Sequence, residues 1–174
     1  MELAMYLDDI RLPFSDSKYR EILKRMKDGR LRPFILLDRD GQIIDGRYQY
    51  KASKFLGIAP ILEEYEGDRR EIRWNYVIDS INEKPLSPGQ RAALIVYEAD
   101  KQGMLNTHGG DRKEDASGLS QKELAKLARV CDRHIQRAVK VLTFGSEYLL
   151  SVYRNEISLT EMQDKLRLEL GDPW

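Results

Sequence analysis

Five polar residues close together near residue 135 have side chains suited to binding nucleic acid. They are Arg133, His134, Gln136, Arg137 and Lys140. Arginine binds guanine through two parallel hydrogen bonds, glutamine binds adenine in the same way, and lysine or arginine neutralises backbone phosphates. If one α-helix runs through this segment, its period places these side chains opposite an apolar stripe that begins at Ile135 and ends at Leu142.

Two short helices are expected to position this polar face. Ser120 and Glu123 have the spacing of a capping box at the start of the first helix, and Leu124, Leu127 and Ala128 give it an apolar stripe. After a break at 129–131, a second helix is expected from residue 132. This layout is typical of a helix-turn-helix, whose second helix enters the major groove of DNA. An ordinary helical hairpin with a solvated basic face is the structural alternative.

The charge and the turn of segment 119–142 bear on the choice between a helix-turn-helix and an ordinary helical hairpin. Six Lys and Arg residues stand against two carboxylates there. Arg129 occupies a turn position that often needs positive φ and is usually glycine, and a non-glycine residue with positive φ costs about 1 kcal/mol. Either Arg129 adds a phosphate contact or the turn differs from the usual one. Cys131 stands at the cap position of the second helix, which Asp132 could take instead, and we expect a buried structural thiol. The predicted DNA-binding residues are Ser120, Gln121, Arg129, Arg133, His134, Gln136, Arg137 and Lys140.

Composition excludes several classes of function. The 174 residues suffice for one domain or two small ones, and 29 basic residues balance 29 acidic ones. A zero balance argues against a general polyanion binder, because non-specific affinity depends on neutralising phosphates. A single cysteine excludes an internal disulfide and a multi-cysteine zinc site. No apolar run approaches membrane-spanning length and the first residues are acidic, so we expect a cytosolic protein without a membrane partner.

The rest of the chain predicts an α+β protein. A mixed sheet with helices is expected first, then an all-helical part with an acidic tail. The predicted domains are 1–101, a linker at 102–118, and 119–174. The predicted strands lie near 34–37, 42–44 and 60–62, and the predicted helices at 15–28, 48–57, 69–82, 88–101, 148–152 and 158–170.

Several segments in this order resemble ParB-like proteins. The run GQIIDGRYQYKASKFLGIAPILEEY (41–65) looks like their N-terminal domain, and VIDSINEKPLSPGQRAALIVYEADK (77–101) is similar to the helices that follow. THGGDRKEDAS (107–117) and RNEISLTEMQDKL (154–166) resemble segments flanking the helix-turn-helix of short ParB-like proteins from phages and mobile elements. The resemblance implies a sulfiredoxin-related N-terminal domain and a DNA-binding helix-turn-helix domain, without the C-terminal dimerisation domain of partition proteins.

In partition ParB proteins the N-terminal domain binds and hydrolyses CTP. On that resemblance, the nucleotide-binding candidates are Gly46, Arg47, Gln49, Lys51, Asp79 and Asn82. A helix N-terminus with guanidinium groups attracts a phosphate. However, Gln49 stands where the family has a second arginine. Glu83 puts a negative charge where the family has a positive, phosphate-binding side chain. We therefore expect no cofactor and no enzymatic activity. Sulfiredoxin chemistry is excluded because the one cysteine lies in the helix-turn-helix segment.

These observations predict a sequence-specific double-stranded DNA-binding protein, acting in partition or in transcriptional regulation of a mobile element or chromosome. A homodimer through the N-terminal domain or the tail helices is left open. The alternative is a nucleotide hydrolase, with CTP or ATP, or a Mg²⁺-dependent nuclease that uses the Asp45-Gly46-Arg47 loop. In that alternative Asp38, Asp45 and Asp79 would hold the Mg²⁺ ion.

Overall fold

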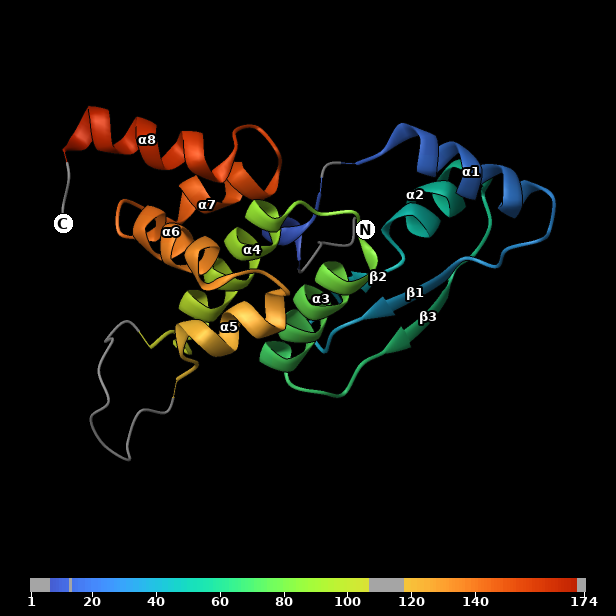
Figure 1. The fold of residues 1–174 in the computed structure, drawn as a ribbon. Coiled ribbons are helices and arrows are strands. Elements are labelled where there is room, and N and C mark those ends of the chain that lie inside the picture. Colours follow the sequence, from blue (N-terminus) through green and yellow to red (C-terminus); the bar gives the residue numbers. More distant parts are fainter. Residues whose placement is uncertain (1–6, 13, 107–117, 172–174) are drawn as a thin grey trace. The chain divides into compact units, whose positions relative to one another are not determined.

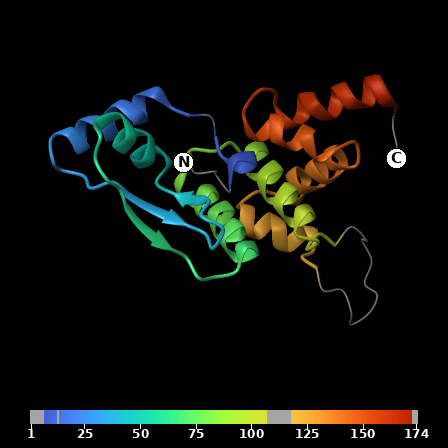
Figure 2. The same cartoon turned by 180° about the vertical axis from the view of Figure 1, so that it is seen from behind.

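The computed structural model describes residues 7–12, 14–106 and 118–171, and the chain forms two compact units, Met1–Ile72 and Arg73–Trp174. Residues 107–117, which are most of the predicted linker at 102–118, lie outside the described residues. The two units divide within a helix, α3 (Arg69–Glu83). Each unit is described by itself below (Figures 1 and 2).

The first unit contains a three-stranded mixed sheet. Its strands are β1 (Phe34–Leu37), β2 (Ile43–Asp45) and β3 (Ile61–Glu64), in the order β2-β1-β3. β1 and β2 form an antiparallel hairpin, whose turn contains Gly41 at φ 73°. β3 runs parallel to β1 with Phe34 opposite Ile61. The parallel pairing requires the intervening chain to cross back to the start of β1.

Two helices and a short 3₁₀ turn complete the first unit. They are η1 (Asp8–Ile10), α1 (Asp16–Lys27) and α2 (Arg47–Leu56). Ser15 caps α1 by accepting the Lys18 N–H. α1 and α2 pack against each other, and α2 packs on β1 (Figure 1), where Ile35 and Ala52 are fully buried.

Gly46 sets the junction between β2 and α2. Its φ is 91°, and a Cβ placed on it would lie 2.6 Å from the Phe34 carbonyl oxygen. A side chain at this position is therefore incompatible with the close approach of the loop to β1.

The second unit is helical and is built around α4 (Pro88–Lys101). Ser87 and Gln90 cap this helix reciprocally, Pro88 occupies its first turn, and 92–99 are buried without a break. α5, α6, α7 and α8 all pack against it (Figure 1). Their bounds are α5 (Gln121–Ala128), α6 (Asp132–Leu142), α7 (Ser146–Tyr153) and α8 (Leu159–Leu170).

A buried ion pair joins the C-terminal part of α3 to α4. Arg73 Nε lies 2.8 Å from Glu98 Oε1, and Arg73 Nη2 lies 2.7 Å from Glu98 Oε2. Gln102 also donates to Glu98 Oε1, at 2.6 Å. Arg73 and Glu98 are 7% and 0% exposed, so each charge depends on the other for its stabilisation.

The α+β class and the predicted helices and strands are confirmed, with ends displaced by a few residues at most. The ends of the predicted linker lie together, because the Leu119 N–H donates to Met104 O and the Asn106 N–H donates to Leu119 O. The search for membrane-spanning segments found no helix of sufficient length and hydrophobicity within the described ranges.

Candidate nucleic-acid interface

The first helix of the candidate interface begins with the predicted capping box. Ser120 Oγ accepts the Glu123 N–H at 3.3 Å, and Glu123 Oε2 accepts the Ser120 N–H at 2.8 Å. Hydrogen bonds from the Ser120 hydroxyl and N–H hold the pKa of Glu123 below its usual value. The side chain of Ser120 is thus engaged within its own helix, and Gln121 is the first helical residue.

The turn between α5 and α6 has the backbone conformation predicted for it. Arg129 is left-handed, with φ 53° and ψ 48°. Its N–H donates to Lys126 O at 3.2 Å, and the Val130 N–H donates to Ala125 O at 3.0 Å, which closes α5. The Arg129 side chain is exposed.

The expectation of a buried thiol at Cys131 is wrong, because Cys131 is exposed. The residue is the N-cap of α6 by backbone conformation, and no side chain caps this helix end. Its Sγ lies 3.0 Å from His134 Nδ1. A chain entering a helix from an exposed turn leaves the cap side chain at the surface, which the residue type alone does not reveal.

α6 separates an apolar face from a basic one. Ile135, Ala138 and Val141 are fully buried. Arg133 and Gln136 are exposed, and Arg137 and Lys140 are half-buried on the same side, within about 100° of arc at 100° per residue. These four predicted residues form the basic face of α6.

His134 lies away from that face. It lines a crevice together with Gln90 from α4 and Ser158 and Thr160 from the start of α8. The sequence assigned His134 to the polar face by residue type, but its position is a quarter turn from Arg133 and borders the buried side of the helix.

One contact to α6 was not predicted. Arg137 Nη1 donates a hydrogen bond to Thr160 Oγ1 at 2.9 Å. The two residues are 23 apart in the chain, and Thr160 lies in the acidic tail, where no DNA-binding residue was predicted. No local sequence signal connects them.

The nucleotide candidates of the first unit lie at the start of α2. Arg47 Nη2 donates to the Leu12 carbonyl at 2.9 Å, and its guanidinium lies 4.9 Å from the Tyr48 ring centre. Lys51 Nζ lies 4.3 Å from the ring centre of Phe14. The two cations therefore fasten the segment before α1 onto α2. Gln49, two residues after Arg47 in the chain, is half-buried.

The remaining nucleotide candidates belong to the second unit. Asp79 and Asn82 are exposed on α3, and so is Glu83. The structure brings Gly46, Arg47, Gln49 and Lys51 together on one helix start.

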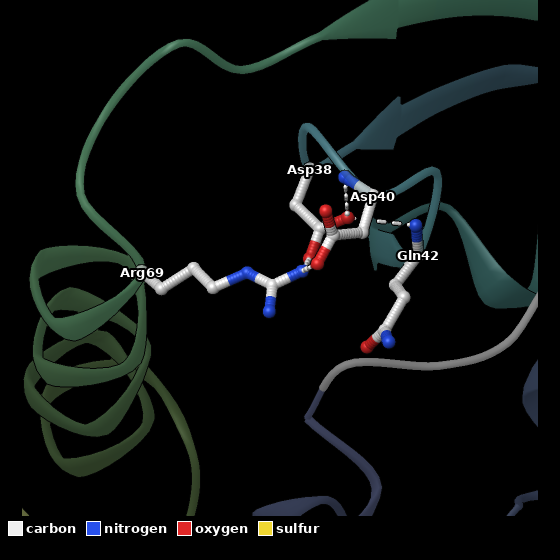
Figure 3. A network of polar contacts seen from close by, with 4 residues as sticks. All are labelled: Asp38, Asp40, Gln42 and Arg69. Atoms are coloured by element: carbon white, nitrogen blue, oxygen red, sulfur yellow. Dashed lines mark hydrogen bonds and ion pairs between the residues drawn. The ribbon is translucent and has the colours of Figure 1, made fainter.

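Asp38, one of the three carboxylates considered for Mg²⁺, is engaged in a local network (Figure 3). Its Oδ1 accepts the N–H groups of Asp40 at 3.0 Å and Gln42 at 2.8 Å, and its Oδ2 lies 2.7 Å from Arg69 Nη2. Arg69 also pairs with Asp40. Desolvation acts to lower the pKa of Arg69, but Asp38 and then Asp40 outweigh it and raise that pKa.

The network fixes the β1–β2 turn to the start of α3, as the four labelled residues of Figure 3 show. Among the residues that the structure describes, no group of three or more His, Cys, Asp or Glu side chains could hold a metal ion.

Comparisons with known proteins identify the fold. No protein-family model matches the sequence, and no curated protein matches it. The structure of a Pnob8-like ParB-N domain is similar to this chain, with a TM-score of 0.54 and 15% identity, over 97% of this chain and 78% of that one. The C-terminally truncated chromosome-partitioning protein ParB from Caulobacter crescentus, complexed to the centromeric parS site, gives a TM-score of 0.41 and 14% identity, over 91% of each chain. The chain has a ParB-like fold, as its motifs predicted.

Proposed function

We propose that this chain of ParB-like fold is a sequence-specific double-stranded DNA-binding protein, in which α5 and α6 form a helix-turn-helix and α6 is the recognition helix. The observation that supports it best is the division of α6 into a buried apolar face and an outward basic face. That arrangement anchors the helix while leaving Arg133, Gln136, Arg137 and Lys140 available to base edges and phosphates.

The turn supports the same proposal. The left-handed Arg129 ends α5 three residues before α6 begins, and its side chain is exposed. A guanidinium at that place is suited to a backbone phosphate. The side chain of Ser120 is engaged in a cap, so the proposed contribution of this helix start comes through Gln121.

The ParB-like fold supports a role in partition of a DNA molecule, with transcriptional regulation as a second use of the same DNA contact. The second unit would supply the DNA contact. The first unit would serve as an interaction domain, and a homodimer would read a site with two-fold symmetry.

The first test is selection of bound sequences from a random duplex pool with the full chain. We then expect Arg133→Ala and Arg137→Ala each to weaken binding to the selected site about 10- to 100-fold, because a bidentate base contact is worth about 1–3 kcal/mol. If either residue instead binds phosphate, its removal should weaken the dependence on salt. The slope of log affinity against log salt concentration (the salt slope) should then fall in magnitude by about 1. Fluorescence anisotropy at several salt concentrations measures both quantities.

Arg20→Ala is the matched control, since Arg20 is an exposed arginine on α1 and its loss changes the net charge equally. Its affinity should stay within about twofold of the parent chain, because Arg20 belongs to α1 and not to the proposed DNA-contacting helices, and an exposed charge is screened by salt. An unchanged affinity and salt slope in both α6 variants, or a selection that yields no preferred sequence, would exclude the proposal.

A further inference from the structure

Arg137, on the basic face of α6, forms a hydrogen bond with another helix. Its Nη1 donates to Thr160 Oγ1, and Thr160 is the second residue of α8. Arg133, one turn earlier on the same face, is exposed. The guanidinium of Arg137 is therefore oriented by a group outside the α5–α6 pair.

The first turn of α8, which contains Thr160, is held by packing and by a helix cap. Leu159, Met162 and Leu166 bury the inner side of α8, and α8 packs against α6. Ser158 Oγ accepts the Glu161 N–H at 3.2 Å, and Glu161 Oε2 accepts the Ser158 N–H at 3.1 Å. The two residues thus form a reciprocal capping box at the start of α8. These contacts hold the backbone of α8 at Thr160, and the Thr160 side chain itself is exposed.

A guanidinium has five N–H donors in a rigid plane, and the bond to Thr160 uses one. The others remain for a bidentate acceptor such as guanine or a phosphate. An arginine side chain that is already oriented loses less rotamer freedom when it binds than one that is free in solvent. The bond therefore prepares Arg137 for its ligand.

We propose that Thr160 is a positioning residue for DNA recognition by Arg137, so that the specificity of the recognition helix depends on α8. This inference rests on the proposed DNA-binding function. The opposite relation is a contact that competes with DNA, in which Arg137 must leave Thr160 before it can bind. The two relations predict opposite signs for the effect of removing the hydroxyl.

The experiment measures the affinity of the full chain for its selected duplex and for duplexes with each base pair changed. We expect Thr160→Val to weaken binding to the selected site about 2- to 10-fold, which is the cost of ordering one long side chain. The affinity lost in Thr160→Val should come from the same base pair or phosphate whose contribution Arg137→Ala removes. Thr160→Ser keeps the hydroxyl and should restore the parent affinity and discrimination.

A double-mutant cycle separates positioning from a structural role. If Thr160 acts through Arg137, the variant Arg137→Ala/Thr160→Val should bind no more weakly than Arg137→Ala alone. If Thr160 only supports the fold, the two losses should add, and the inference is wrong. Thr143→Val is the control, since Thr143 is an exposed threonine whose hydroxyl bonds to Lys140 O within α6.

Two results overturn the inference while leaving DNA binding intact. One is an unchanged affinity for Thr160→Val, and the other is a tighter one, which would show that the contact competes with DNA. Failure of the parent chain to bind any duplex would instead remove the proposed function. Thermal unfolding of each variant shows whether the chain remains folded.

Discussion

Arg129 and Gly46 both adopt positive φ, but for different physical reasons. At Gly46 an added Cβ would collide with the Phe34 carbonyl oxygen, so glycine is the residue the packing allows. At Arg129 the side chain is exposed, and the cost lies only in its own left-handed backbone. An arginine can be retained there at a cost of about 1 kcal/mol, which a functional contact of its side chain would explain.

Replacing Arg129 with glycine should therefore stabilise the chain and weaken DNA binding. We expect Arg129→Gly to raise the free energy of unfolding by about 0.5–1 kcal/mol, the left-handed penalty minus the greater backbone entropy of glycine. Urea denaturation measures this change, and anisotropy should show a weaker affinity for the selected duplex.

Asn155→Gly provides the comparison, because Asn155 also has positive φ, 64°, outside the α5–α6 turn. Asparagine tolerates this conformation better than arginine, so the stabilisation should be smaller. Equal affinity of Arg129→Gly and the parent chain for DNA would count against a phosphate contact by Arg129.

Sequence patterns predicted the residue-scale features that depend on neighbours in the chain. The left-handed turn at Arg129 and the reciprocal cap of Ser120 and Glu123 are examples. The exposure of Cys131 and the bond between Arg137 and Thr160 depend on how separate helices pack. Neither leaves a periodic or local signal in the sequence.

At the scale of elements, the Arg73–Glu98 pair joins α3 to α4 within the second unit. Its two hydrogen bonds connect the part of α3 from Arg73 onward to α4. The sequence predicted the helices α1 to α8, with ends displaced by a few residues at most. It did not show which helices pack together, since an apolar stripe specifies a buried face without naming its partner.

Glu98→Ala should lower the free energy of unfolding by about 3–5 kcal/mol, because it leaves the Arg73 guanidinium buried without its counter-charge. Replacing both residues with leucine should recover most of that loss, since no uncompensated charge then remains. Urea denaturation of the full chain measures both variants.

Glu21→Ala serves as the control, because Glu21 forms an exposed pair with Arg25 at 3.8 Å. A pair that is accessible to water contributes little, so a change below about 0.5 kcal/mol is expected. A similar small loss for Glu98→Ala would contradict the view that the buried pair holds α3 to α4.

For the whole molecule, the question is whether a nucleotide takes part in DNA binding. Arg47 bonds to the Leu12 carbonyl and lies over the Tyr48 ring, and Lys51 lies over the Phe14 ring. A phosphate would have to compete with these contacts, and Gln49 offers it no compensating charge. The balance of 29 basic and 29 acidic residues likewise gives no general attraction for polyanions.

We therefore expect CTP with Mg²⁺ to bind more weakly than about 1 mM and to leave the affinity for the selected duplex unchanged. Isothermal titration of the full chain measures the first quantity, with a DNA titration of the same sample as the positive control. Saturable heat that disappears in Arg47→Ala would support the nucleotide alternative instead.

The parallel pairing of β1 with β3 has a kinetic consequence. Phe34 and Ile61 are joined by a loop that contains β2 and α2, so their pairing must close a long stretch of chain before it gains any stabilisation. In the helical unit, α4 packs most extensively on α7 and α6, and more chain separates α4 from α7 than separates β1 from β3. Because contacts distant in sequence form slowly, the helical unit should not reach its native contacts before the sheet does.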